Sequence, residues 1–285
     1  DPERGLEVIK YTKNFLDNYF PLSKFSWKNV LKLEIVDNYL NLKCYKGETK
    51  LKAPNKYIGY RGDKKNPEAI ILKNNNLHIE IIINRQAFSA KSDPAGIADI
   101  IVEAAVTTIC DHEDSVASVD ASDKVTGYRN WLGLMKGELK SNFVKKGKNF
   151  VRKLNPDRSF IAKDGSKSKL KGRALLLNRN TGHLMTNPSI LLDDGSEIPE
   201  GIMDAFITSL CSMHDLKSRK NSITGSIMIV KPKQHGPDEC EFTDLIFGKV
   251  EEVLNLQKYT IKCGIMDEER RTSVNLKECI RKLKH

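Results

Sequence analysis

The N-terminal third of the chain has patterns of apolar and polar residues that predict one helix and two hairpins. Apolar residues recur every three or four positions over residues 6–19, which predicts an amphipathic helix that ends before Pro21. Alternating patterns follow in residues 31–42 and 70–83, and each is interrupted by Asp or Asn residues typical of tight turns. We expect Asp93 to cap a further helix with Pro94 at its first position. This part of the chain is therefore predicted to be rich in strands.

After residue 105 the pattern changes to short apolar segments that alternate with helical ones. The four predicted pairs are strand 106–110 with helix 123–135, 174–178 with 199–215, 226–230 with 237–254, and 260–265 with 272–283. Repeated strand–helix units predict a parallel sheet with right-handed crossovers. Part of an eight-stranded barrel and a doubly wound sheet both fit this pattern. On helix 237–254 the residues expected to face inward are Phe242, Leu245, Ile246, Val250 and Val253.

Charged and amide side chains follow each of the four predicted strands, in residues 111–115, 178–180, 231–235 and 267–271. In a barrel the carboxyl ends of the strands converge on one face, where active sites form. Glu268 and the pair Asp111 and Glu113 are candidate ligands for Mg²⁺, a cation that prefers carboxylate oxygens. Arg179 would offer a fixed fork of donors to a carboxylate or to a developing oxyanion. The pattern thus predicts metal-assisted chemistry on a small oxo-acid.

The composition is that of an ordinary globular protein, with 39% hydrophobic and 29% charged residues. The net charge is +10, and the segment 136–173 carries thirteen Lys and Arg against three acidic residues. A solvated lysine-rich surface, a site for a phosphorylated small molecule and a nucleic-acid patch all fit this segment. Its few aromatic residues lack the spacing of an RNA-binding motif.

The sequence contains none of the common single-motif signatures. There is no C-x-x-C among the six cysteines, which predicts reduced thiols in a cytosolic protein, and no H-E-x-x-H, G-x-S-x-G, G-x-G-x-x-G or Walker A pattern. No apolar stretch is long enough for a membrane span. Because the first residue is Asp1 and no signal core follows, we expect an excised or processed piece.

Nine stretches of the sequence resemble malate synthase, in particular its long bacterial G form. They are GYRGD (59–63), KNNNLHIE (73–80), EDSVASVDASDKV (113–125), YRNWLGLMKG (128–137), VRKLNPDR (151–158), GHLMTNP (182–188), EIPEGIMDAF (197–206), IVKPKQHGP (229–237) and GIMDEERRTSVNLK (264–277). The stretches are long and are distributed over essentially all 285 residues.

The resemblance implies an α/β fold, namely the first half of a (β/α)₈ TIM barrel with an inserted α/β domain. Residues 1–103 and the basic segment 137–173 would form the inserted domain. Residues 104–136 would be the first strand–helix unit of the barrel, and residues 174–285 the next three units.

The activity implied by the resemblance is an acyl transfer in which the acyl group becomes an alkyl group. Malate synthases use Mg²⁺ to condense acetyl-CoA with glyoxylate and water, which gives malate and CoA in the glyoxylate cycle. Arg179 in LLNRN matches the catalytic arginine that contacts glyoxylate, and Glu268 in MDEERR matches the Mg²⁺ ligand that also contacts glyoxylate. Ser115 and Arg152 match contacts to acetyl-CoA. We expect a cytoplasmic enzyme that is monomeric at full length, with no nucleic-acid or membrane partner.

Other parts of the family's site are expected to lie outside this chain. Asp111 and Glu113 are implied to order waters on the metal. The second metal-binding Asp would follow the next barrel strand, beyond His285, and the catalytic base would lie in a further domain, so we expect the isolated chain to be inactive. The chain departs from the family at Thr181, usually Val, and at Ile223, usually Arg, and neither position is a matched ligand.

Two other functions also fit parts of the sequence. A CoA-ester lyase of the citrate-lyase β type shares a barrel, an arginine and acidic Mg²⁺ ligands, but it lacks the inserted domain. A non-catalytic basic binding protein would explain the charge alone.

Overall fold

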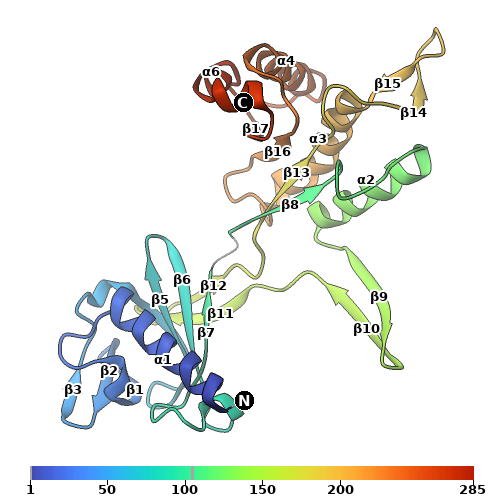
Figure 1. Ribbon diagram of the computed structural model, residues 1–285. Coiled ribbons are helices and arrows are strands. Elements are labelled where there is room, and N and C mark those ends of the chain that lie inside the picture. The colour runs from blue at the N-terminus through green and yellow to red at the C-terminus, as the bar shows by residue number, and fades with distance from the viewer. Residues whose placement is uncertain (1, 104–105) are drawn as a thin grey trace. The chain divides into compact units, whose positions relative to one another are not determined.

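The computed structural model describes residues 2–103 and 106–285, which fall into two compact units (Figure 1). Unit 1 contains the described residues up to 103 together with Asp157–Lys171. Unit 2 contains Val106–Pro156 together with Gly172–His285. Each unit has apolar clusters of its own. The chain therefore leaves unit 1 after its first part and returns to it for one later segment.

Unit 1 combines a long helix with two antiparallel sheets. Its elements are α1 (Pro2–Tyr19), η1 (Trp27–Asn29), β1 (Val30–Val36), β2 (Tyr39–Cys44), β3 (Gly47–Thr49), η2 (Pro54–Lys56), β4 (Tyr57–Gly62), β5 (Pro67–Asn74), β6 (Leu77–Ile83), η3 (Phe88–Ala90), β7 (Ile97–Val102), β11 (Arg158–Ala162) and β12 (Lys167–Leu170). One sheet has the order β1-β2-β3 and the other has the order β12-β11-β4-β5-β6-β7. Leu16 of α1 and Phe20, the residue directly after α1, are buried with Trp27 in a cluster that includes residues of both sheets.

Both predicted hairpins are confirmed, as β1–β2 and β5–β6. Their turns contain Asp37 and Asn38, with φ of 48° and 63°, and Asn75 and Asn76, with φ of 48° and 65°. Two successive left-handed residues form the type I′ turn that matches the twist of a hairpin, and Asn and Asp tolerate this conformation best after glycine. The turn residues therefore set the register of both hairpins.

The predicted helix cap at Asp93 is wrong. Asp93 is buried, its Oδ1 accepts hydrogen bonds from the backbone N–H groups of Ala95 and Ile97, and its Oδ2 lies 2.6 Å from Lys13 Nζ. The chain turns at Gly96, with φ of 73°, and continues as β7. A long-range ion pair with α1 thus replaces the helix that the local sequence favours.

A buried carboxylate joins the later segment to unit 1. Glu80 on β6 is 1% exposed, and its two oxygens lie 2.9 Å from Arg61 Nη1 and 2.7 Å from Arg158 Nε. Arg158 begins β11, which pairs with β4. The six-stranded sheet is therefore complete only when the segment after residue 156 has joined it.

Unit 2 is built around a four-stranded parallel sheet. Its elements are β8 (Thr107–Asp111), α2 (Ala121–Lys136), β9 (Lys140–Lys145), β10 (Lys148–Lys153), β13 (Leu175–Arg179), β14 (Thr186–Leu191), β15 (Glu197–Pro199), α3 (Glu200–Ser218), β16 (Ile227–Lys231), α4 (Pro237–Val253), β17 (Ile261–Ile265), α5 (Arg270–Val274) and α6 (Leu276–Lys282). The sheet order is β17-β16-β13-β8, and all three pairings are parallel. The four predicted strands and their parallel arrangement are confirmed.

The strand order bears on the two folds that the sequence left open. The strands lie side by side in chain order, and α2 packs on α3, α3 on α4, and α4 on α6. A doubly wound sheet would reverse its strand order at a switch point, and no reversal is present among the described strands. The sheet does not close into a barrel within the described residues. None of the helices described is both long and apolar enough to cross a bilayer.

Part of the predicted inward face of α4 is wrong. Ile246, Phe247 and Val250 are buried against β16 and β17, whereas Leu245 is 67% exposed and Val253 is 60% exposed. Phe242 is also exposed. The helix has apolar residues on more than one side, so periodicity alone did not identify the side that contacts the sheet. The predicted helix 272–283 is likewise divided at Asn275 into α5 and α6.

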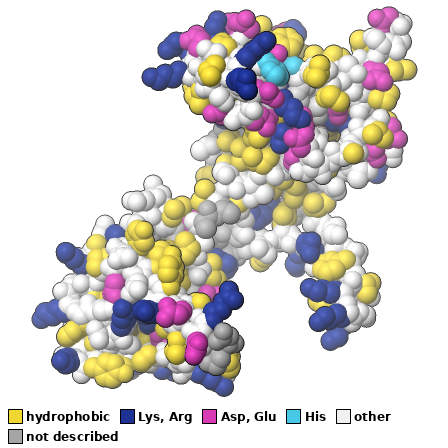
Figure 2. Space-filling view, viewed as in Figure 1, with side chains coloured by type: hydrophobic (Ala, Val, Ile, Leu, Met, Phe, Trp, Pro, Cys, Tyr) yellow, Lys and Arg dark blue, Asp and Glu magenta, His cyan; other side chains and the backbone are white. Residues whose placement is uncertain are grey.

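The basic segment contributes an exposed two-stranded hairpin to unit 2. In β9–β10 the rings of Phe143 and Phe150 stack 5.6 Å apart, while Val144 and Val151 are exposed. Figure 2 shows dark blue and yellow side chains together on this arm. The hairpin belongs to unit 2 by its contacts within the chain. The sequence analysis places residues 137–173 in an inserted domain, and that assignment stays a prediction.

Candidate functional site

Arg179 lies at the carboxyl end of β13 and contacts acidic residues from two other strand ends. The parallel register pairs Arg179 with Asp111, the last residue of β8. The guanidinium Nη1 lies 3.6 Å from Asp111 Oδ2, and Nη2 lies 3.0 Å from Asp114 Oδ2 and 3.5 Å from Glu268 Oε1. Arg179 is 8% exposed, and its buried Nε has no hydrogen-bond partner among the described residues. A buried donor without a partner is suited to receive an anionic ligand.

Asp111 organises the loop that follows β8. Its Oδ2 accepts hydrogen bonds from the N–H and the hydroxyl of Ser115, and its Oδ1 accepts one from the Glu113 N–H. Burial opposes ionisation of Asp111, but the bonds from Ser115 and Glu113 and the charge of Arg179 outweigh it and lower the pKa of Asp111. Asp111 is therefore a fixed carboxylate beside Arg179.

Lys233 connects three of the acidic residues and was not singled out by the sequence analysis. Its Nζ lies 2.6 Å from Glu113 Oε1 and 2.7 Å from Asp114 Oδ1, and its backbone N–H donates to Glu268 Oε1 at 2.9 Å. The hydrogen bonds to Asp114 and Glu113 raise the pKa of Lys233, and the bond from Lys233 lowers the pKa of Asp114. The signal was available, since Lys233 follows the end of β16 by two residues.

The carboxylates around Arg179 present the oxygen ligands that Mg²⁺ prefers. Mg²⁺ often binds through one or two protein carboxylates and keeps its other positions for water and substrate oxygens. Glu268 and Asp111 both lie beside Arg179, so either carboxylate could face such an ion directly or through a bound water. The part of the chain that the structure describes contains no cluster of three or more His, Cys, Asp or Glu residues arranged to hold a metal. An ion here would therefore need water or substrate oxygens to complete its coordination.

The structure brings together five of the six predicted site residues. Arg179, Glu268, Asp111, Glu113 and Ser115 are connected directly or through Lys233. Arg152 lies apart on the exposed strand β10, where its guanidinium stacks 5.0 Å from the centre of the Phe143 ring. Its described contacts do not reach the Arg179 cluster.

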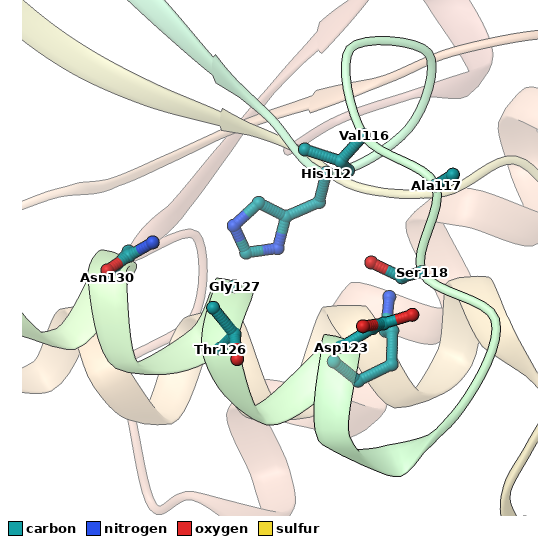
Figure 3. Close-up of a pocket in the computed structure, with 9 residues that line it drawn as sticks. His112, Val116, Ala117, Ser118, Asp123, Thr126, Gly127 and Asn130 are labelled. Atoms are coloured by element: carbon teal, nitrogen blue, oxygen red, sulfur yellow. The ribbon is translucent and has the colours of Figure 1, made fainter.

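A cavity of about 330 Å³ lies between the loop after β8 and helix α2 (Figure 3). The lining residues are His112, Val116, Ala117, Ser118, Asp123, Lys124, Thr126, Gly127 and Asn130. Figure 3 shows the His112 ring projecting from the end of β8 toward Gly127 on α2. Burial lowers the pKa of His112, which favours a neutral ring. The volume falls in the range of small-molecule sites.

His183 lies in the loop after β13, and its lowered pKa predicts that the 285-residue chain loses stability in acid. Burial and the charge of Lys231 lower the pKa of His183 from 6.5 to about 4. Between these values the unfolded chain takes up a proton that the folded chain resists, so stability falls as the pH decreases from 6.5 toward 4. At pH 5 we expect a loss of about 1 to 2 kcal/mol, allowing for solvent screening of a partly exposed ring.

Urea unfolding of wild type and His183→Gln at pH 7 and pH 5 measures this loss. The variant should lose less stability than wild type between the two pH values. His214→Gln, at an exposed histidine on α3, is the matched control and should behave as wild type. Equal pH dependence in wild type and His183→Gln would remove His183 as the source.

Comparisons with known proteins give one consistent result. The family model "Malate synthase, TIM barrel domain" matches residues 175–285, and the model "Malate synthase G, alpha-beta insertion domain" matches residues 1–74. Malate synthase G of Halalkalibacterium halodurans is 48% identical over 288 aligned positions, which cover 100% of this chain and 40% of the relative. Malate synthase G of Corynebacterium efficiens and of Corynebacterium glutamicum are each 50% identical, over 98% and 97% of this chain and 38% of each relative. The chain thus spans about 40% of the length of these curated relatives.

Proposed function

The chain belongs to the malate synthase G family, and from this premise we propose that the natural protein condenses acetyl-CoA with glyoxylate and water to give malate and CoA. The observation that carries the proposal is the buried Arg179 guanidinium, which lies among carboxylates and keeps one N–H without a partner among the described residues. Glyoxylate is a small anion with a carboxylate and an aldehyde. Its negative charge complements the positive charge of the Arg179 guanidinium.

In this proposal Arg179 binds glyoxylate and stabilises the negative charge that develops on the aldehyde oxygen. The charge appears when the enolate of acetyl-CoA forms the new carbon–carbon bond, and fixed donors are worth most at such an oxygen. A guanidinium is a poor proton acceptor, so we assign removal of the methyl proton to a carboxylate. Ion pairs on both sides of the guanidinium hold its orientation.

We assign the role of Mg²⁺ ligand to Glu268, which contacts both Arg179 and the Lys233 N–H. When bound there, Mg²⁺ would supply positive charge that polarises the aldehyde of glyoxylate. Asp111 and Glu113 would hold waters around the ion. The all-oxygen donor set and the low pKa of Asp111 support this assignment.

We also propose that unit 2 is the first part of a (β/α)₈ barrel into which an α/β domain is inserted. The sequential parallel strands, the successive packing of α2, α3, α4 and α6, and the barrel-domain match over residues 175–285 support this interpretation. The insertion-domain match over residues 1–74 supports the assignment of the first segment.

Acetyl-CoA is proposed to bind beside the loop after β8. Ser115 directly precedes Val116, which lines the 330 Å³ cavity, and this volume is large enough for part of acetyl-CoA. Arg152 would supply positive charge to the phosphates of CoA. Its stacking on Phe143 holds the guanidinium on the hairpin while leaving the residue exposed.

Arg152→Ala should raise the KM for acetyl-CoA at least fivefold and leave the KM for glyoxylate within twofold. The reason is that the proposed contact involves only CoA, and higher ionic strength should mimic part of the effect. Steady-state kinetics of the natural protein measure both constants. Lys148→Ala, which removes a charge from the same hairpin, is the control for a general effect of charge. A raised KM for glyoxylate alone would contradict the assignment.

A coupled assay of the natural protein tests the proposed function. Acetyl-CoA, glyoxylate and Mg²⁺ should together release free thiol and an equal amount of malate, and omission of any one should stop both. A CoA-ester lyase would instead cleave a malyl-CoA-like thioester at its carbon–carbon bond, with no net malate. That second result, or thiol release without malate, would refute the proposal.

A further inference from the structure

The backbone that follows Arg179 is held by buried hydrogen bonds of Thr181 with Asp204 and Lys231, which we call the Thr181 clamp. The N–H and hydroxyl of Thr181 both donate to Asp204 Oδ2, at 2.9 and 2.8 Å. The carbonyl of Thr181 accepts a hydrogen bond of 2.6 Å from Lys231 Nζ. Thr181, Asp204 and Lys231 are at most 3% exposed. Each polar group of the residue two positions after Arg179 is therefore bonded to α3 or to β16.

The other oxygen of Asp204 is held just as firmly. Oδ1 lies 2.6 Å from Lys124 Nζ and accepts a 2.5 Å hydrogen bond from the Tyr128 hydroxyl. Lys124 also donates to Glu200 Oε1 at 2.9 Å. Burial opposes ionisation of Asp204, but the charge and hydrogen bond of Lys124 outweigh it, and the pKa of Asp204 is lowered. The Asp204 carboxylate is thus charged, and Lys124 and Tyr128 of α2 hold it in place.

Helix α3 has no side chain where it approaches the clamp. A Cβ atom on Gly201 would lie 2.5 Å from Lys231 Nζ, 2.6 Å from the Gly182 oxygen and 2.7 Å from the Thr181 oxygen. These distances are far below van der Waals contact, so the approach requires glycine at this position. The first turn of α3 is therefore fitted to the strand end that carries Arg179.

Gly182, the next residue along the chain, is held from the loop that follows the neighbouring strand β8. Its N–H donates to Glu113 Oε2 at 2.7 Å, and Glu113 Oε1 pairs with Lys233. The segment from Arg179 to Gly182 is thus fixed on the α3 side by Asp204 and on the site side by Glu113. The position of the Arg179 backbone depends on both.

We propose that Asp204 is a positioning residue that, by holding Thr181, places the Arg179 guanidinium for the anionic substrate. This inference rests on the proposed function. Asp204 does not contact the reacting atoms; it acts through the backbone of β13. Lys231 has the same role at the Thr181 carbonyl.

Kinetics of Asp204→Asn in the natural protein test this role. Asparagine keeps the size and one acceptor oxygen but removes the charge, so the clamp should loosen without leaving a cavity. We expect kcat to fall at least tenfold, with the KM for acetyl-CoA within twofold of wild type. Asp215→Asn is the matched control, because Asp215 is equally buried and binds backbone N–H groups at the other end of α3. Its kcat should stay within threefold of wild type.

A loss of kcat below threefold in Asp204→Asn, or an equal loss in Asp215→Asn, would overturn the proposal. If Asp204→Asn fails to fold, the kcat of Lys231→Met is measured instead and judged by the same thresholds. This variant is expected to fold, because an apolar side chain of similar length removes the cost of a buried cation. Wild-type protein without malate formation would instead refute the proposed function, so the two failures are distinguishable.

Discussion

Replacing Arg179 with lysine should lower the turnover of the natural protein by about 100-fold or more, which corresponds to the loss of one donor at a developing oxyanion. Lysine keeps the positive charge but cannot present two fixed N–H groups to one ligand while it also contacts Asp111 and Asp114. Thiol release and malate formation at saturating substrates measure the effect. The fold should persist, because the carboxylates retain a cationic neighbour.

The control for this change is Arg129→Lys, at an exposed position on α2. It makes the same chemical exchange away from the site and should leave turnover unchanged. Activity of Arg179→Lys within about threefold of wild type would remove Arg179 from the mechanism.

Glu268→Gln should have the second large effect, on metal-dependent binding. Glutamine keeps the length and one oxygen that can accept the Lys233 N–H, but it lacks the negative charge that a hard cation requires. We expect Mg²⁺ affinity, measured by calorimetry on the 285-residue chain, to fall at least about tenfold, or about 1.4 kcal/mol. Glyoxylate binding in the presence of Mg²⁺ should fall with it.

Glu252→Gln is the control for the loss of a carboxylate, because Glu252 forms an exposed pair with Lys249 on α4. This variant should bind Mg²⁺ as wild type does. Unchanged Mg²⁺ affinity in Glu268→Gln would show that another group holds the ion. A loss of glyoxylate binding with Mg²⁺ affinity intact would limit Glu268 to contact with the substrate.

The parts of the fold that were predictable from sequence depend on local signals. Asn and Asp pairs with positive φ determine the hairpin turns, and short apolar segments determine the parallel strands. The prediction at Asp93 was wrong because its partner, Lys13, is eighty positions away in the chain. The inward face of α4 was only partly right because Leu245 and Val253 are apolar but lie on the exposed side.

The sequence also predicted part of the candidate site, namely the residues brought together by the parallel strands. The convergence of strand ends follows from parallel topology, and it brings Asp111, Arg179 and Glu268 together as expected. The pairing of Lys233 with two acids was not foreseen, because it depends on the path of the loop after β16. Asp204 was missed because a single acid within a helix gives no periodic signal, and its partner Thr181 lies in the loop after β13.

The nested arrangement of the two units has a consequence for synthesis on the ribosome. β8 of unit 2 is synthesised before β11 and β12, the last two strands of the six-stranded sheet of unit 1. The strand that pairs with β8, β13, begins only at Leu175. The indole of Trp131 on α2 hydrogen-bonds the Thr208 carbonyl, 77 residues later in the chain. Because synthesis proceeds at roughly 5 to 20 residues per second, several seconds pass between the synthesis of α2 and that of the part of α3 that covers its apolar face. Trp131 and Met135, which are buried in the folded unit, would stay exposed during this interval, and transiently exposed apolar side chains favour aggregation.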